Sequence, residues 1–152
     1  MKLSDLNIAL PPYREIAHSI DMEPEQKEAY RSFQDDLLTE LRMALNQGSK
    51  RLLGVYLQAL LGYSDSPWVQ EIIKDKESGR VLAESTPLPE NTLYPKEKEL
   101  LRICTEAKRD NRKTVVYCVH TETRDITERL KKILGDAGLA GRGAESRKGK
   151  GR

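Results

Sequence analysis

The apolar positions of the chain change period several times, and the first clear period is two. In the stretch YREIAHSIDM, every second residue would lie on the same face of a strand. The residues of that face are Ile16, His18, Ile20 and Met22. Such alternation is typical of a β-strand with one buried face. Pro11 and Pro12 precede it and cannot donate to a ladder. The pattern predicts a strand over residues 13–22.

Two helices are predicted next. Pro24 suits the first turn of a helix, and apolar residues then recur every three or four positions as far as Gly48: Tyr30, Phe33, Leu37, Leu41 and Leu45. The second helix, residues 50–62, carries leucines, Val55 and Tyr56 around much of its circumference. A helix of that composition is expected to lie enclosed between neighbours.

The middle of the chain predicts a β-hairpin followed by an extended connector. Two apolar runs flank KESG in VQEIIKDKESGRVLAES, which is a hairpin pattern. Pro87 and Pro89 favour extended backbone, and Pro95 marks a new helix start. That helix, down to about Arg109, has an apolar face of Leu100, Leu101, Cys104 and Ala107.

The last predicted unit is a strand followed by a helix. Residues 114–119 are almost continuously apolar, which is typical of a central strand in a parallel sheet. Thr121 or Thr123 can cap the following helix, whose expected buried face is Ile126, Leu130, Ile133, Leu134 and Ala137. A lone parallel strand has no partner within its own unit. Three outcomes are open: residues 13–22 pair with it, another chain does, or this end is only marginally folded.

Together these elements predict a helix-dominated α/β fold, with long helices, a β-hairpin and an incomplete βα unit. The expected organisation is a strand and helical segment over 1–62, a loop and hairpin insertion over 63–94, a βα unit over 95–139 and a tail over 140–152. At 152 residues the chain is long enough to bury a core without disulfides.

Charge is distributed unevenly along the chain. The net charge is +2, but the tail after Leu139 has a balance of +4, so the rest of the chain carries −2. The body is therefore not a basic nucleic-acid platform, and the glycine-rich tail is expected to be disordered. Cys104 and Cys118, without CxxC spacing, indicate a reducing cytoplasm and buried thiols. No apolar run is long enough to span a membrane.

Several stretches resemble the Snf2-like branch of superfamily 2 helicases, across the junction of its two RecA-like lobes. LPPYREIAHSIDMEPEQKEAYRSF is similar to an LPP strand followed by a helix start with Met22, Pro24, Gln26 and Tyr30. LLGVYLQALLGYSDSPW is similar to the next helix of the family. YPKEKELLRICTEAKRDNRKTVVYCVHTETRDITERLKKIL resembles the opening of the second lobe, with motif IV at Val115 to Thr121. The resemblance covers most of residues 8–139 and is closest to large helicase-like proteins of bacterial mobile elements and phages.

The departures from this family bear directly on activity. The chain has no GxxxxGK[ST] loop to cradle phosphates and no Asp-Glu pair to hold magnesium. It also lacks the arginine-bearing motif of the second lobe, which would stabilise the transferred phosphoryl group. No ATPase is therefore expected from these residues alone. ATP and Mg²⁺ are implied only for a complete family member, and no cofactor or metal is expected here.

By position, motif IV implies a contact to the nucleic-acid backbone through His120, Thr121, Thr123 and Arg124. A helix N-terminus with hydroxyls and a guanidinium can hold a phosphate, although Glu122 and Asp125 would repel one. The alternative is that a threonine caps the helix, Asp125 complements its dipole and Arg124 is solvated. The resemblance adds Lys96, before the first helix of the lobe. Its alternative, shared with Lys98, is a solvated lysine paired with a nearby acid.

Other chemistry-bearing residues have simpler explanations. Trp68 and Tyr63 offer a surface for base stacking, but an aromatic residue in such a loop more often covers nearby leucines. The basic turn of Arg109, Arg112 and Lys113 is expected to be solvated. Histidines and cysteines lie on different elements without metal-ligand spacing.

Two functional hypotheses follow from these observations. The first is a non-catalytic fragment or stand-alone derivative of a Snf2-like DNA helicase, contacting DNA through its backbone or completing a split helicase in trans. The alternative is a protein-interaction module, such as a regulator or inhibitor from a mobile element, with no nucleic-acid role. In the alternative, the apolar helix 50–62 and an incomplete sheet edge form a docking surface or a homodimer interface. A product without function is the third possibility.

Overall fold

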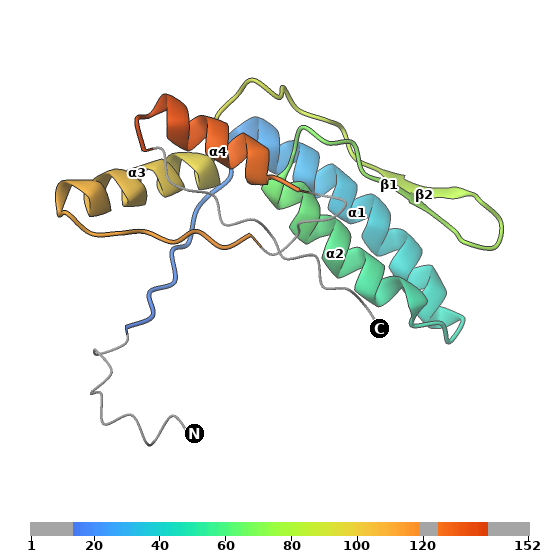
Figure 1. Ribbon diagram of the computed structural model, residues 1–152. Coiled ribbons are helices and arrows are strands. Elements are labelled where there is room, and N and C mark those ends of the chain that lie inside the picture. Colours follow the sequence, from blue (N-terminus) through green and yellow to red (C-terminus); the bar gives the residue numbers. More distant parts are fainter. Residues whose placement is uncertain (1–13, 119–124, 140–152) are drawn as a thin grey trace, which may run out of the picture.

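The computed structural model describes residues 14–118 and 125–139. Within them the chain forms four helices and one β-hairpin, in the order α1 (Pro24–Asn46), α2 (Arg51–Asp65), β1 (Ile72–Lys74), β2 (Val81–Glu84), α3 (Pro95–Arg109) and α4 (Thr127–Asp136) (Figure 1). The predicted helix-dominated fold with a β-hairpin is confirmed, and the four helices begin and end close to the expected residues. None of the helices in these ranges is both long and apolar enough to cross a membrane.

Helices α1 and α2 form an antiparallel pair that carries the main core (Figure 1). The turn between them passes through Gly48, whose φ of 79° lies in the left-handed region that glycine tolerates best. One apolar stripe of each helix meets the other, because residues three and four apart share a face. The core consists of Phe33, Leu37, Ala59, Leu60, Tyr63 and Ala83.

The hairpin closes over this core from one side. Its strands pair antiparallel with Ile73 opposite Ala83, and the buried Ala83 packs into the α1–α2 core. Its turn is held by Asp75, whose Oδ1 accepts the Ser78 N–H at 2.7 Å. The guanidinium of Arg80 then forms two hydrogen bonds to the Glu40 carboxylate, at 3.0 and 2.7 Å. That bidentate contact ties the hairpin to α1.

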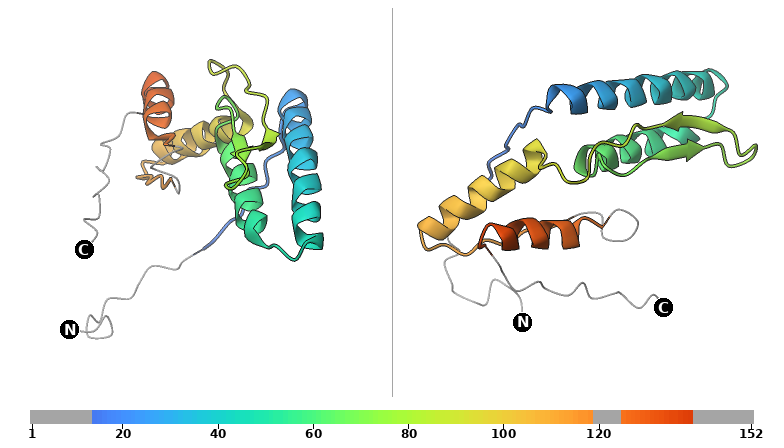
Figure 2. Two further views of the ribbon diagram at one scale, coloured as in Figure 1. Left: turned by 90° about the vertical axis from the view of Figure 1, so that its right-hand side faces the viewer. Right: turned by 90° about the horizontal axis from the view of Figure 1, so that it is seen from above.

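Helices α3 and α4 form the other end of the molecule. They run in the same general direction (Figure 2), and the described segment 110–118 leaves the end of α3 and comes back toward its start, where residues 116–118 lie near Lys96. Pro95 begins α3, where the Glu97 carboxylate accepts the Tyr94 N–H at 2.9 Å. Leu130 of α4 is buried, as predicted, whereas Ala137 is exposed, because α4 ends at Asp136 and Ala137 is its C-cap.

The predicted strand over 13–22 is wrong for the residues that the structure describes. Residues 14–23 have no regular structure and run past α3, held by polar contacts of His18 with Glu99 and of Glu23 with Lys98. Alternation makes a two-faced ribbon, but a strand also needs a neighbouring ladder. The sheet found in the described residues is the hairpin alone, and it lies elsewhere.

The predicted strand over 114–119 is also not formed in its described part. Residues 112–118 have no regular structure, and no backbone hydrogen bond joins 113–118 to the rest of the described chain. The side chains of Val115 and Tyr117 are consequently 71% and 88% exposed. The sequence pattern of a central strand is present, whereas the sheet that would enclose it is not among the described residues.

Helix α2 differs from its prediction as well. It was expected to be enclosed, but it packs through one face and leaves Leu53, Leu57 and Leu61 exposed on another. The reason is that α1 and the hairpin contact only the side carrying Ala59 and Tyr63.

The core predicts a sharp contrast between two positions of α1. Phe33→Ala removes a side chain that is buried against Tyr63, with ring centroids 5.8 Å apart. It should lower the free energy of unfolding by about 3–5 kcal/mol, through lost burial and the cavity left behind. Urea unfolding followed by circular dichroism measures the change. The control Met43→Ala, on the exposed side of the same helix, should stay within about 0.5 kcal/mol; equal losses would contradict this core.

Candidate functional site

A cavity of about 230 Å³ lies where the end of α2, the start of α3, the start of α4 and residues 116–118 meet. Its lining includes Gly62, Asp65, Lys96, Leu100, Tyr117 and Leu130. These elements are distant in sequence, and the site contains both the lysine and part of the motif IV segment implied by the helicase resemblance. The cavity is therefore the candidate ligand site of the described residues.

Lys96 points its charge at an acid of α2 and not at an open site. Its Nζ lies 2.5 Å from Asp65 Oδ1 and 2.9 Å from Ser64 Oγ. Any phosphate at this position would compete with the Asp65 carboxylate for the ammonium group. Lys98, in the same turn, is paired with Glu23 at 2.5 Å. Both lysines are thus paired with acids, but with Asp65 and Glu23 and not with Glu99, the partner that the alternative explanation named.

The other four residues of the implied nucleic-acid contact, His120, Thr121, Thr123 and Arg124, lie outside the described residues. The start of α4 is described, and its N-cap is Ile126. Asp125 Oδ1 accepts the Thr127 N–H at 2.8 Å. Hydrogen bonding to Thr127, through its side chain first and its backbone N–H second, lowers the pKa of the Asp125 carboxyl group. The Asp125 carboxylate thus complements the helix start, as the alternative explanation expected, and it would repel a phosphate there. The predicted cap at Thr121 or Thr123 is wrong, because α4 begins later, after Ile126.

The strongest polar contact of the region joins α4 to α3. Arg129 Nε donates to Glu97 Oε1 at 2.5 Å, and its Nη2 donates to Glu97 Oε2 at 2.9 Å. The guanidinium also donates to the backbone carbonyls of Glu90 and Thr92. Hydrogen bonding to Glu97 raises the pKa of Arg129 above its usual value. Both side chains are largely buried, so the pair is a buried salt bridge that holds α4 against α3.

The same arginine covers Trp68. Its guanidinium carbon lies 3.9 Å from the centre of the indole ring, within the range of a cation–π contact. Trp68 also stacks on Tyr94, with ring centroids 5.8 Å apart. The other aromatic candidate, Tyr63, is completely buried and donates its hydroxyl to the Thr86 carbonyl at 2.7 Å. Base stacking by Trp68 and Tyr63 together is thus wrong, because Tyr63 is a core residue.

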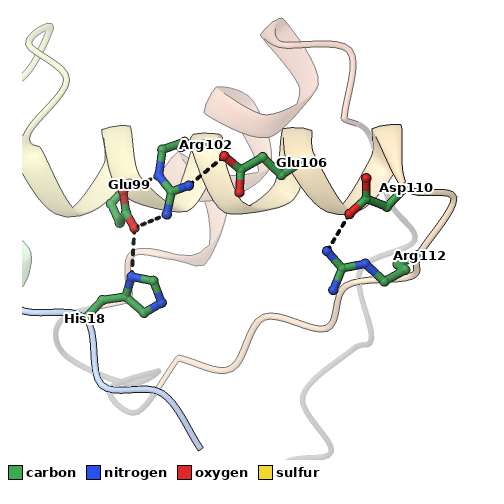
Figure 3. A network of polar contacts seen from close by, with 6 residues as sticks. All are labelled: His18, Glu99, Arg102, Glu106, Asp110 and Arg112. Carbon is green, nitrogen blue, oxygen red and sulfur yellow. Dashed lines mark hydrogen bonds and ion pairs between the residues drawn. The ribbon is translucent and has the colours of Figure 1, made fainter. Parts of the chain in front are cut away.

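The exposed side of α3 carries a chain of charged contacts (Figure 3). Arg102 bridges Glu99 and Glu106, and Glu99 also meets His18 Nδ1 at 2.9 Å. The Arg102 hydrogen bond lowers the pKa of Glu99 to about 2. Separately, Arg112 of the basic turn contacts Asp110 at 2.8 Å. In these contacts each basic side chain is paired with a carboxylate of the same chain, so they do not form a basic patch that is open to a ligand.

The chemistry available at the cavity is limited. Cys118 lines it, but burial raises the pKa of the thiol, so the reactive thiolate is disfavoured at neutral pH. Cys104 is buried, and its thiol pKa is likewise raised by burial. In the described ranges no group of three metal-ligating side chains comes together. The cavity is a packing site between elements, with an apolar wall of Leu100, Val116 and Leu130.

Sequence reasoning missed the residue on which the region depends, Arg129. Its position in the predicted helix gave no signal beyond being a cation beside the apolar stripe. The pairing with Glu97 and Trp68 arises only when α4 lies against the connector.

Comparisons with family models, curated proteins and solved structures find no match for this chain.

The Arg129–Glu97 pair predicts a large loss of stability when only one of its two charges is removed. Glu97→Gln leaves the Arg129 charge largely buried without its counter-charge and should cost about 3 kcal/mol of unfolding free energy. The double variant Glu97→Gln/Arg129→Met removes both charges and should recover part of that loss. Urea unfolding measures both. As a control, Arg112→Ala breaks an exposed pair and should cost less than about 1 kcal/mol. A similar loss of unfolding free energy at both pairs would contradict the stabilising role of the Arg129–Glu97 pair.

Glu99 predicts a defined acid dependence. Its folded pKa of about 2 lies below its ordinary value of 4.5, so its contribution to stability is complete above pH 4.5 and disappears as the pH falls toward 2. The stability difference between the wild type and Glu99→Gln should therefore shrink over that range, as measured by urea unfolding at several pH values. The matched variant Glu128→Gln, on exposed α4, provides the baseline. A difference independent of pH would contradict the Arg102–Glu99 contact.

Proposed function

We propose that this chain is a non-catalytic protein-interaction module of Snf2-like helicase descent, which docks by adding residues 114–118 as a strand to an open sheet edge. The observation that carries the proposal is the exposed, unpaired backbone of this segment. Val115 and Tyr117 stand in solvent, although β-branched and aromatic side chains are those that favour a pleated sheet. A strand added to a sheet edge gains main-chain hydrogen bonds.

The arrangement of the flanking helices supports this proposal. Helices α3 and α4 run in the same general direction (Figure 2), and the described segment 110–118 comes back from the end of α3 toward its start. This is the path of a strand in a parallel α/β unit, where each strand connects two helices. The helices are already positioned by Arg129 and Glu97. The segment therefore needs no rearrangement of the described core in order to pair.

The charges of the site favour a protein over DNA. Lys96 and Lys98 are each paired with a carboxylate, and the carboxylate of Asp125 occupies the start of α4. A phosphate-binding surface requires unpaired cations or helix N–H groups. The proposed partner is accordingly a RecA-like lobe whose sheet lacks one strand, and any ATP chemistry would belong to that partner.

A strand-complementation experiment tests the proposal. The probe is the second lobe of a Snf2-type helicase from which the motif IV strand and its helix have been deleted. The wild-type chain should bind it in isothermal titration and slow amide hydrogen exchange over residues 114–118 by about tenfold or more. Val115→Pro should abolish binding, because proline cannot occupy a central strand. Its melting temperature should not change, since this backbone makes no described hydrogen bond.

The matched control is Val115→Thr, which keeps the β-branched shape and should still bind. Binding that survives Val115→Pro would refute strand addition. A wild-type chain that does not bind the lobe would refute it as well. A duplex DNA arm tests the competing function. Salt-sensitive DNA binding that is lost in Arg124→Ala, and retained when residues 140–152 are deleted, would replace the proposal with a DNA-backbone contact.

A further inference from the structure

Helix α2 presents an apolar ridge that nothing in the described part of the molecule covers. Leu53, Leu57 and Leu61 are 46%, 54% and 58% exposed, and their spacing of four places them along one side of the helix. Residues 52–64 contain no charged side chain. The opposite side of α2, with Ala59 and Tyr63, faces α1. We name the three leucines the leucine ridge.

Gly54 lies beside this ridge and has no role in the packing of the single chain. A Cβ at Gly54 would meet no atom within 4 Å, and the residue has no positive φ. Glycine in a helix interior is unfavourable compared with alanine. Because glycine has no side chain, it permits the close approach of another backbone. The position therefore leaves room for a helix to pack across α2 next to Leu53 and Leu57.

The charges at the two ends of α2 indicate which helix that is. Lys50 and Arg51 lie at the N-terminal end, and Asp65 lies at the C-terminal end. Both ends oppose the dipole of their own helix, which favours acids at the start and bases at the end. A second α2 in antiparallel orientation reverses the situation, because each basic end then lies beside the acidic end of its neighbour.

We infer that the leucine ridge is a symmetric interface with a second copy of this chain, in which two α2 helices pack antiparallel about a two-fold axis near Leu57. In such an isologous contact, Leu53 of one copy meets Leu61 of the other, and Leu57 meets its own equivalent. Arg51 of each copy lies near Asp65 of the other. The existing partners of these charges, Glu77 and Lys96, need not be displaced, because the side chains of Arg51 and Asp65 are 80% and 38% exposed and can take a second contact.

The contact is small, so the dimer should form only as the protein concentration rises. Sedimentation velocity of the full chain from about 1 to 300 micromolar should show a reversible shift from monomer to dimer. Leu57→Glu places two like charges together on the axis and should keep the chain monomeric throughout, with an unchanged melting temperature at low concentration. Leu93→Glu, at another exposed leucine outside α2, should leave the dimer intact.

Gly54→Gln separates an interface role from a structural one. Glutamine is a better helix former than glycine, and the position is open in the single chain, so the melting temperature of the monomer should rise. The longer side chain should nevertheless weaken the dimer at least about tenfold, by blocking the approach of the second helix. A Gly54→Gln chain that dimerises as well as the wild type would overturn the inference.

A charge exchange tests the orientation and the identity of the partner together. Arg51→Glu alone and Asp65→Lys alone should each weaken dimerisation, because like charges then meet at both ends. An equal mixture of the two variants should restore it, since both end contacts of the mixed dimer are again opposite in sign. A chain that stays monomeric at every concentration, or a mixture that restores nothing, would overturn the antiparallel dimer. Val115→Pro should leave this dimer unchanged, which separates the ridge from the proposed strand surface.

Discussion

The bidentate contact between Arg129 and Glu97 is the constraint on which the second half of the molecule depends. It joins α4 to α3, and the same guanidinium binds two connector carbonyls and covers Trp68. Apolar contacts there are few, with Cys104, Ala107 and Leu130 as the buried apolar side chains of the two helices. A largely buried charge pair is costly to break. The Arg129–Glu97 pair, together with the buried Leu130 and the hydrogen bond from Lys108 to the Gly138 carbonyl, therefore holds α4 beside α3.

The unequal burial of apolar residues has a single physical origin. Helices α1 and α2 bury Phe33 and Tyr63 against each other and the hairpin, so the first half satisfies its own core. In the second half, the described residues form two helices, α3 and α4, with no sheet between them. Its apolar run at Val115–Tyr117 consequently lies in solvent. The leucine ridge is a second apolar surface that the described residues leave uncovered, on another element.

The candidate site was only partly predictable from the sequence. The resemblance to helicases drew attention to Lys96 and motif IV, and the structure does place Lys96 beside residues 116–118. It also pairs that lysine with Asp65, an acid at the end of a helix far away in the sequence. Ion pairing between distant elements has no local pattern. For the same reason Arg129 and Trp68 carried no sign of their contact, although each residue type is common in cation–π pairs.

Local physical rules determined the helices and the hairpin. Pro24 and Pro95 begin helices, apolar residues recur at helical spacing, and the turn before Arg80 uses Gly79 with a φ of 71°; each signal acts within a few residues. The same local rules were wrong for residues 14–22 and 114–118. A strand exists only where a second strand supplies the other half of its hydrogen bonds, and only the tertiary structure decides whether that neighbour is present.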